Sequence, residues 1–593
     1  MTTSNAWNPG LESNIPTRLW PLVTLFREEN AFVSHSDASE LADLTGLKVL
    51  ELVSLRPERL LIHSLLVRVT ADLSVQDGPN YEELGINLRE MVETIHLKHI
   101  APHVDSIVTV LDNEREKARI YITEQLSLQF DQTNVQTPSD AEEASFLKAL
   151  IVRLFKREVV PEEPNETQGS LEITAIECWK QQLLSADTSL HRACLTALIK
   201  TVSVITGHRG RMLPDHSLVT RVAVNQVCNT HGSDVIDDYI EDLWKQAVAA
   251  EKYRFLPAQS APVIMNVKGA SASGKSTIRP QQRRLSEKLG TPWEDFALIS
   301  PDYWRKYLLD YTSLGEDYKY GAMLTGRELE MIDKKLDRYM ANKASKGAMS
   351  HLLIDRFRFD SFSVDQPADS KLLSRFGDQV YLFFMVTHPA ETVTRAFERG
   401  KKTGRYKAVD DLLHHNVEAF TGMPSLFLSW VNMKNKRIHF EFLDNDVPEG
   451  QLPKTAAFGW NETLVVLDVR LLLNIDRYRK VNISAKKPAD IFSEADHDEQ
   501  ENTGFIMQCA RTVTRIIFAD QDTAQEYATL IGGKLVWWDS EYIGQHAHIE
   551  GLQEILAALG YSGQTCDRSS ADFKTQIDIA TEQMVTVGRW CNT

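Results

Sequence analysis

The sequence predicts an α/β fold for the middle third of the chain, built on a doubly wound parallel sheet of about five strands. Three observations support this prediction. Between about residues 16 and 256, apolar residues recur three and four apart, as in amphipathic helices. After residue 262, short runs rich in β-branched and aromatic residues alternate with helical patterns, which is typical of parallel strands joined by helices. A glycine-bounded loop directly follows the first of these runs.

The 593 residues are too many for one hydrophobic core, so several domains are expected. Two stretches rich in Pro, Asn, Thr, Ser and acid, 131–145 and 161–170, are typical of linkers. We predict a large helical N-terminal region and a smaller C-terminal region around the core. The predicted domains are a mostly helical domain over 1–140, a second helical domain over 146–258, the parallel-sheet core over 260–450 and an α/β or α+β appendage over 460–593.

Composition excludes several classes of protein. A net charge of -17 disfavours a protein that coats nucleic acid or an anionic membrane. The six cysteines are scattered without a CxxC pair, which indicates free thiols in a reducing compartment. The longest apolar run, 380–386, is far shorter than the about 20 residues that span a bilayer, and the N-terminal residues do not resemble a signal peptide. We therefore expect a soluble, cytoplasmic protein without a membrane partner.

The core elements follow from the apolar pattern. The predicted helix RELEMIDKKLDRYM places Leu329, Ile332 and Leu336 on one face. Pro280 falls a few residues into the helix expected after the first strand, which favours a kink there. The predicted strands are VIMNV, FALIS, HLLID, VYLFFMVT and IHFEFL, at 263–267, 296–300, 351–355, 380–387 and 438–443.

The strongest motif is GASASGKST, which matches the P-loop pattern GxxxxGK[ST] and directly follows the first predicted strand. Gly269 and Gly274 allow the backbone to curl so that successive N–H groups form an anion nest at a helix N-terminus. We expect Lys275 to reach the β- and γ-phosphates of ATP and the Ser276 hydroxyl to bind Mg²⁺. The predicted nucleotide site comprises Gly269, Ala270, Ser271, Ala272, Ser273, Gly274, Lys275, Ser276 and Thr277.

Residues after the next strands favour transfer of a phosphoryl group to a hydroxyl. Guanine-reading NKxD and transporter LSGGQ motifs are absent from the sequence, and Asp355 is followed by Arg356 rather than by a water-activating Glu. Asp302 and Arg305 follow the second strand, where a carboxylate could accept a hydroxyl proton and an arginine could hold the acceptor. Asp302 could instead cap a helix. Asp355 is expected to hold Mg²⁺, with a strand-end turn as the alternative.

Other basic residues are candidates for phosphate contacts. Arg356 and Arg358 could bind acceptor phosphate or pair with Asp360. The fourth strand leads into a basic segment that is either a solvated helix face or a lid that closes arginines over the transferring group. Its basic residues are Arg395, Arg399, Lys401, Lys402, Arg405 and Lys407, of which Arg399 and Arg405 are predicted to be catalytic.

These residues resemble the zeta toxin-type P-loop kinases, a family with a Walker A loop. The resemblance rests on GASASGKST, ISPDYWR, LLIDRFR, RAFERGKKTGRY and FLDND, and covers 263–446, about a third of the chain. It implies Asp302 as general base, Arg305 at the acceptor, Arg399 and Arg405 in the lid, and Lys275 and Ser276 at nucleotide and metal. Zeta toxins phosphorylate UDP-N-acetylglucosamine. Because Ser300 stands where many members carry an acid, we carry over the reaction and not the substrate.

The leading hypothesis is a P-loop kinase core that uses ATP and Mg²⁺ to phosphorylate a hydroxyl of a small, phosphorylated or nucleotide-like acceptor. One alternative is a 5′-hydroxyl polynucleotide kinase, which would need a basic groove in flanking regions that are acidic here. Another is a nucleotide-gated interaction protein with little turnover, whose helical N-terminal region binds a protein partner.

Overall fold

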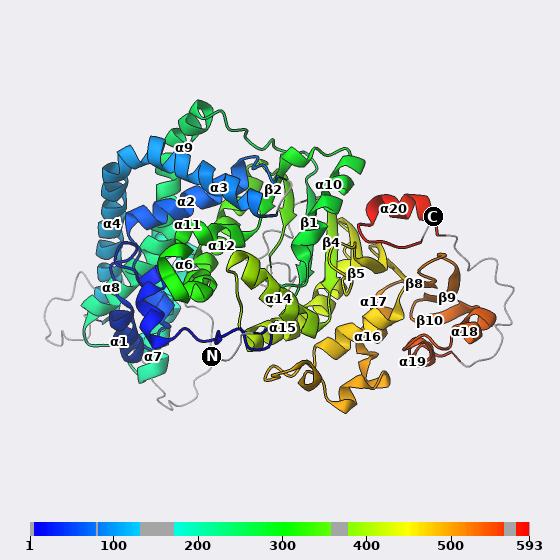
Figure 1. Cartoon of the computed structure of the whole chain (residues 1–593). Helices are drawn as coiled ribbons and strands as arrows, with labels where there is room; N and C mark the ends of the chain where they lie inside the picture. The colour runs from blue at the N-terminus through cyan, green and yellow to red at the C-terminus, as the bar shows by residue number, and fades with distance from the viewer. Residues whose placement is uncertain (1–4, 79–80, 131–170, 357–376, 562–576, 592–593) are drawn as a thin grey trace, which may run out of the picture. The chain divides into compact units, whose positions relative to one another are not determined.

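The computed structural model describes residues 5–78, 81–130, 171–356, 377–561 and 577–591 (Figure 1). The predicted linkers and Arg358 lie outside these residues. The chain forms two compact units: unit 1 comprises Met1–Thr24, Leu65–Ala101 and Leu243–Thr593, and unit 2 comprises Leu25–Ser64 and Pro102–Asp242. Each unit therefore combines segments that lie far apart in the sequence. The sequence prediction instead divided the chain into four consecutive domains.

Unit 2 is helical in its described residues. The long helix α7 begins after Thr188, whose Oγ1 accepts a hydrogen bond from His191 N, and ends at Gly210 with φ of 77°. Helices α2 and α9 contribute residues to both units. The helices of unit 2 and these two are α1 (His35–Thr45), η3 (Val49–Leu52), α2 (Pro57–Asp72), α4 (Val104–Phe130), α6 (Leu171–Leu184), α7 (Ser189–Arg209), α8 (His216–Val227), η7 (Cys228–Gly232) and α9 (Ser233–Ala250).

Unit 1 contains a mixed sheet in the order β10-β9-β8-β7-β6-β5-β4-β1-β3-β2. The stretch β2-β3-β1-β4-β5 is parallel throughout, whereas β5-β6, β6-β7, β8-β9 and β9-β10 are antiparallel. The general α/β class predicted from the sequence is confirmed. The strands are β1 (Val263–Gly269), β2 (Phe296–Ile299), β3 (His351–Ile354), β4 (Gln379–Val386), β5 (Arg437–Asp444), β6 (Lys454–Trp460), β7 (Thr463–Val466), β8 (Arg515–Ala519), β9 (Glu526–Ile531) and β10 (Lys534–Trp538).

Helices cover both faces of the parallel strands, since every residue of β1 is buried whichever way its side chain points. Helices α10, α12, α14 and α15 lie close to these strands in Figure 1. The helices of unit 1 include η1 (Thr17–Leu22), α3 (Tyr81–Ile95), η4 (His96–Ile100), η8 (Lys275–Ile278), α10 (Arg279–Lys288), η10 (Pro301–Trp304), α11 (Arg305–Leu308), η11 (Tyr311–Tyr320), α12 (Gly321–Ser345), α14 (Pro389–Thr403), α15 (Val409–Val431), α16 (Val469–Tyr478), α17 (Gly504–Thr512), α18 (Ser540–Gln545), α19 (Leu552–Ala558) and α20 (Ile579–Val585).

The C-terminal segment continues the same sheet. The predicted core ends at residue 450, between β5 and β6, and these strands are hydrogen-bonded neighbours. A buried carboxylate of β5, Glu441, accepts hydrogen bonds from Thr455 Oγ1 at 2.6 Å, Val587 N at 2.8 Å and Gly588 N at 2.9 Å. Burial raises the pKa of Glu441 to about 7. Glu441 thus ties the segment after α20 to the middle of the sheet.

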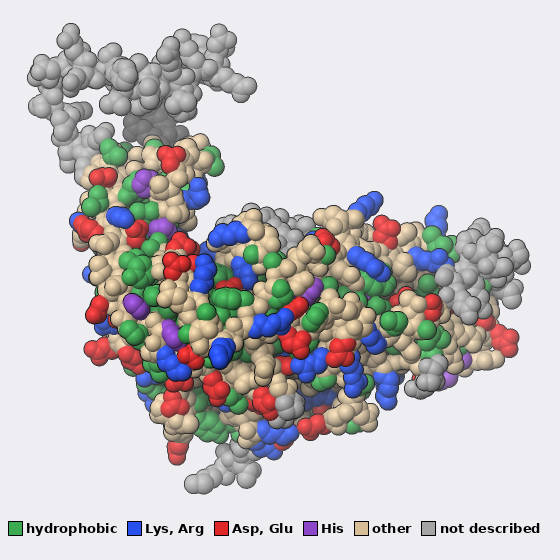
Figure 2. Space-filling model, turned by 90° about the horizontal axis from the view of Figure 1, so that it is seen from above, with side chains coloured by type: hydrophobic (Ala, Val, Ile, Leu, Met, Phe, Trp, Pro, Cys, Tyr) green, Lys and Arg blue, Asp and Glu red, His purple; other side chains and the backbone are tan. Residues whose placement is uncertain are grey.

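The surface agrees with the composition. Figure 2 shows Lys and Arg side chains interspersed with Asp and Glu over the face that it displays. Among the helices of the described ranges, none combines the length and the apolar character needed to cross a bilayer.

Candidate functional site

The glycine-bounded loop predicted from the sequence lies where β1 ends. A Cβ added at Gly269 would lie 2.6 Å from Ser273 Oγ and 2.8 Å from Met385 O. Gly274 has φ of +91°, and a Cβ there would lie 2.2 Å from Asn445 Nδ2. Both positions therefore require glycine, because the chain curls tightly between them and packs against the ends of β4 and β5.

Two buried side chains hold the loop from behind. Thr387, directly after β4, donates from Oγ1 to Ser273 O at 2.9 Å. Asn445, directly after β5, donates from Nδ2 to the same oxygen at 2.8 Å. The sequence analysis quoted Asn445 only within the FLDND motif and did not assign either residue a role. Together they fix the loop at the carboxyl edge of the parallel strands, where α/β proteins commonly bind ligands.

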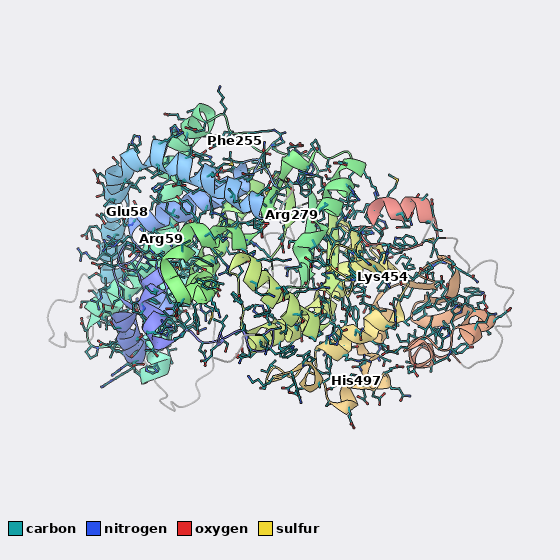
Figure 3. All side chains as sticks on the ribbon, in the orientation of Figure 1. Glu58, Arg59, Phe255, Arg279, Lys454 and His497 are labelled. Atoms are coloured by element: carbon teal, nitrogen blue, oxygen red, sulfur yellow. The ribbon has the colours of Figure 1, made fainter. Side chains whose placement is uncertain are left out.

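The element after the loop corrects one prediction. Residues Lys275–Ile278 form a 3₁₀ turn, η8, and α10 begins at Arg279 with Pro280 in its first turn. The first turn of a helix does not use the backbone N–H that proline lacks, so Pro280 costs α10 no hydrogen bond. Arg279, labelled in Figure 3, donates from Nη1 to the Tyr303 hydroxyl at 2.9 Å and so braces η10 against α10.

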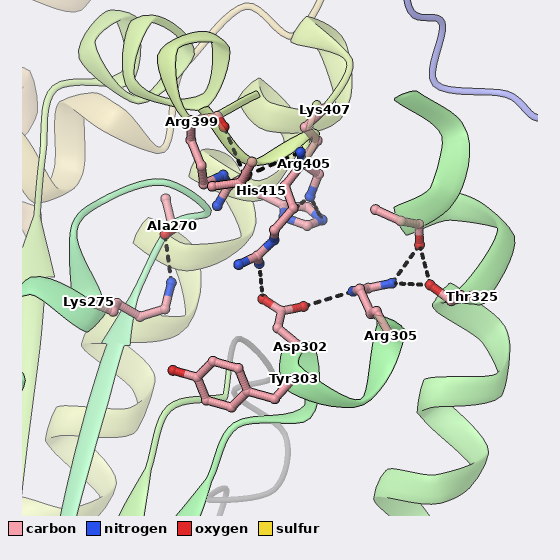
Figure 4. Close-up of polar contacts among 12 residues, drawn as sticks. Ala270, Lys275, Asp302, Tyr303, Arg305, Thr325, Arg399, Arg405, Lys407 and His415 are labelled. Carbon is pink, nitrogen blue, oxygen red and sulfur yellow. Dashed lines mark hydrogen bonds and ion pairs between the residues drawn. The ribbon is translucent and has the colours of Figure 1, made fainter. Parts of the chain in front are cut away.

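Lys275 lies over the loop. Its Nζ donates to Gly269 O at 3.1 Å and to Ala270 O at 2.8 Å (Figure 4). Burial lowers the pKa of Lys275, while the negative charges of Asp355 and Asp302 act in the opposite direction. The ammonium is therefore within electrostatic reach of both predicted carboxylates.

Asp302 bridges two arginines from different parts of the chain. Its Oδ1 accepts from Arg305 Nε at 2.9 Å and its Oδ2 from Arg405 Nη2 at 2.6 Å (Figure 4). Burial alone would raise the pKa of Asp302, but Arg405, Arg305 and Arg399 hold it well below its usual range. The alternative of helix capping is wrong, because Ser300 occupies the N-cap position of η10. Asp302 is thus an ionised carboxylate at neutral pH, with 43% of its side chain exposed.

Arg305 is also bound to α12. Its Nη1 also donates to Ala322 O at 2.5 Å and to Thr325 Oγ1 at 2.9 Å, both on α12. Arg305 thereby fixes one side of Asp302. On the other side, Arg405 follows Gly404, which has φ of 76° at the end of α14.

The basic segment divides into two groups. Lys401 pairs with Glu398 and Lys402 with Glu449, so these lysines form ordinary solvated ion pairs. Arg395 donates to the carbonyls of Asn445 and Val447 and supports the end of β5. By contrast, the positive charges of Arg399 and Arg405 act on both Lys275 and Asp302. Arg399 and Arg405 therefore belong to the site around the loop.

Lys407 and His415 belong to the same cluster, although the sequence analysis assigned no site role to His415. Lys407 Nζ donates to His415 Nδ1 at 2.6 Å and lies 3.3 Å from Asp411 Oδ2. Burial lowers the pKa of Lys407 to about 8, and burial together with Lys407 lowers the pKa of His415 to about 2. At neutral pH His415 is therefore a neutral acceptor that orients a charged Lys407.

Arg356 has a different environment from the one predicted. Its side chain is 2% exposed, with Nη1 2.6 Å from Asp337 Oδ1 and Nη2 2.7 Å from Asp333 Oδ1, both on α12. The prediction that Arg356 contacts acceptor phosphate receives no support from this geometry. The arginine instead joins the end of β3 to α12.

The predicted metal ligands are Ser276, in η8 next to Lys275, and Asp355, whose N donates to Ile299 O at 2.9 Å. Within the described ranges, no group of three or more His, Cys, Asp or Glu side chains is arranged to hold a metal ion. Mg²⁺ at phosphate sites takes one or two protein ligands and completes its shell with phosphate oxygens and water. A hydroxyl and one carboxylate beside the glycine-bounded loop fit that donor set.

Comparison of the chain with protein-family models, curated proteins and solved structures found no match. The assignment of a function therefore rests on the residues of this site. It holds the cations Lys275, Arg305, Arg399, Arg405 and Lys407 and the carboxylates Asp302 and Asp355, in a chain whose net charge is negative. Such an excess of positive charge suits an anionic ligand.

Proposed function

We propose that this protein is an ATP- and Mg²⁺-dependent phosphotransferase that moves the γ-phosphoryl group to a hydroxyl of a small, phosphorylated or nucleotide-like acceptor. The observation that carries the proposal is Asp302, held between Arg305 and Arg405 beside the glycine loop and Lys275. The motif resemblance to zeta toxin-type kinases supports the same reaction.

In the proposed mechanism, backbone N–H groups of the loop and Lys275 bind the phosphates of ATP. Ser276 and Asp355 would hold Mg²⁺, which neutralises charge on the phosphate oxygens. The acceptor oxygen forms a bond to the γ-phosphorus, the bond from that phosphorus to the β,γ-bridging oxygen breaks, and ADP leaves. Asp302 takes the proton of the hydroxyl, and Arg399 and Arg405 stabilise the charge on the transferring group.

The two ion pairs of Asp302 also favour an anionic acceptor. A carboxylate bound by two arginines is a weak base, since both arginines stabilise its ionised form. A phosphate on the acceptor competes for Arg305 and Arg405, which weakens these pairs and returns the pKa of Asp302 toward its ordinary value. An acceptor that lacks a phosphate leaves Asp302 fully paired.

The test is Asp302→Asn in the full chain, compared with the exposed surface variant Asp522→Asn. We expect Asp302→Asn to fold and bind ATP as the wild type does but to lose transfer by about 10²-fold to 10⁴-fold, the usual contribution of a general base. Labelled ATP with a cell metabolite extract reports transfer, and a fluorescent ATP analogue reports binding. Undiminished transfer would show that Asp302 is not the base. Wild-type ATP binding without transfer to any acceptor would contradict the proposed function.

A further inference from the structure

A groove outside the candidate site lies between α4 and α8 of unit 2, which run side by side in Figure 1. Its volume is about 440 Å³. We call it the α4/α8 groove. It is lined by Arg115, Arg119, Thr123, Leu126 and Ser127 of α4 and by His216, Ser217, Thr220, Arg221, Val224 and Asn225 of α8.

The two helices run in opposite directions. The ring of Phe130, the last residue of α4, lies 5.5 Å from the ring of His216, the first residue of α8. At the opposite end, Glu114 lies 3.5 Å from His231, which follows α8. Side chains three or four residues apart on each helix therefore form the two walls of the groove.

The walls are apolar along one part and positively charged along the other. Leu126 and Val224 are buried, and the methyl groups of Thr123 and Thr220 extend the apolar surface. Three arginines, Arg115, Arg119 and Arg221, line the groove, and none of its lining residues is Asp or Glu. In a chain with a net charge of -17, a concave surface that carries arginines without an acid is distinctive.

The arginines differ in how far their own neighbours satisfy them. Glu116 accepts from both Nε and Nη2 of Arg119, which leaves that side chain well paired. Arg115 donates from Nη1 to Asp112 at 2.6 Å, and its guanidinium lies 5.4 Å from the centroid of the Phe32 ring and near the Cys228 thiol. Its Nη2 is buried and has no oxygen or nitrogen acceptor among the described residues. A buried charged donor without an acceptor is costly, so an acceptor supplied by a ligand would be stabilising.

Arg221 is the second group that can engage a ligand. It is exposed, lies on the groove wall, and forms no ion pair within the part of the chain that the structure describes. The Asp215 carboxylate, at the N-cap of α8, interacts with it electrostatically. Because so exposed an attraction is weak, a ligand in the groove can compete for the guanidinium.

We propose that the α4/α8 groove binds a small amphiphilic anion, with its carboxylate at Arg115 and Arg221 and its apolar body along Leu126 and Val224. The volume lies in the range of about 300 to 1,000 Å³ that is typical of small-molecule sites. A protein partner would need a larger surface than a groove of this size offers. The inference is independent of the proposed phosphotransferase activity.

The experiment is a calorimetric titration of the full chain with decanoate. Decyltrimethylammonium, which has an alkyl chain of nearly the same length and the opposite charge, tests the role of the arginines. We expect one decanoate to bind per chain and decyltrimethylammonium to bind at least about tenfold more weakly, as expected when a charge-assisted hydrogen bond is lost.

Three variants locate the site. Arg221→Gln should weaken decanoate binding about tenfold. Thr123→Trp should abolish it, since Thr123 is exposed and an indole there fills the groove without altering the core. Arg211→Gln, an exposed arginine outside the groove, should bind as the wild type does. Absence of decanoate binding, equal binding of both amphiphiles, or binding that Thr123→Trp leaves unchanged would overturn the proposal.

Discussion

Arg356 and Arg405 illustrate how similar residues take different roles in one α/β unit. The sequence made both of them candidates for phosphate contacts. Arg356 is 2% exposed and is paired with Asp333 and Asp337 of α12. Arg405 is 20% exposed and is paired with Asp302, whose side chain reaches solvent. The first pairing is closed inside the fold, whereas the second lies open at the edge of the sheet.

The difference shows that burial, and not residue type, separates an arginine closed inside the fold from one that a ligand can reach. A buried ion pair leaves its partners uncompensated when it is broken, so its loss is costly. A partly exposed pair is screened by water and contributes little to stability, but a ligand can exchange with it. Each variant below tests one side of this comparison.

The largest change in stability is expected for Arg356→Leu. Removing the guanidinium leaves Asp333 and Asp337 without their cation, which should lower the free energy of unfolding by about 4 kcal/mol. Urea unfolding followed by circular dichroism measures this. Arg327 is an exposed, ion-paired residue on α12, the helix that carries Asp333 and Asp337, so Arg327→Leu should lower the free energy of unfolding by less than about 1 kcal/mol. Equal losses in the two variants would contradict the comparison.

Glu441 differs from both arginine pairs, because its buried carboxyl group is bound by hydrogen-bond donors and not by a cation. Its pKa of about 7 in the folded state exceeds the usual value of about 4.5, so the folded state binds more protons between these two pH values. Its contribution to stability is therefore full below pH 4.5 and is lost as pH rises through 7. The change is on the order of 3 kcal/mol.

Glu441→Gln removes this titration. The unfolding free energies of the wild type and of Glu441→Gln are measured by urea unfolding from pH 5 to pH 8. As pH rises, the wild type should lose stability relative to the variant. Parallel pH profiles of the two proteins would show that Glu441 does not titrate in this range.

The smallest change in stability is expected for Arg405→Gln. Its pair with Asp302 is partly exposed, so unfolding should change by less than about 1 kcal/mol. If the proposed function holds, transfer should nevertheless fall about 100-fold, because a charge next to the transferring group is lost. Lys402→Gln, which removes a surface pair with Glu449, should leave both transfer and stability unchanged. A large loss of stability in Arg405→Gln would show that the pair with Asp302 stabilises the fold as the Arg356 pairs do.

The five parallel strands could be predicted almost to the residue. Strands β1 and β4 are buried on both faces, which requires the continuous apolar runs that the sequence shows. The continuation through β6 to β10 could not be predicted, because the pairing of β7 with β8 joins residues about 50 apart with no local signal. The spacing of apolar residues shows that a strand is buried, but it does not show which strand pairs with it.

The candidate site was predictable where chain order alone determines position. Lys275, Asp302 and Arg405 come together because each follows the carboxyl end of a parallel strand, directly or after one helix. The inward turn of Arg356 was not predictable, since it depends on two aspartates of α12 that face β3. His415 was missed for a similar reason, because its role arises from the packing of α15 against the basic segment.

The bonds of Glu441 also bear on how the chain folds as it is synthesised. The two backbone donors that this carboxylate needs lie 146 and 147 residues further along. A ribosome adding about 5 to 20 residues per second reaches them many seconds after β5 has emerged. During that interval Glu441 lacks both backbone donors, so the bonds that tie β5 to the segment after α20 form only once that segment has emerged.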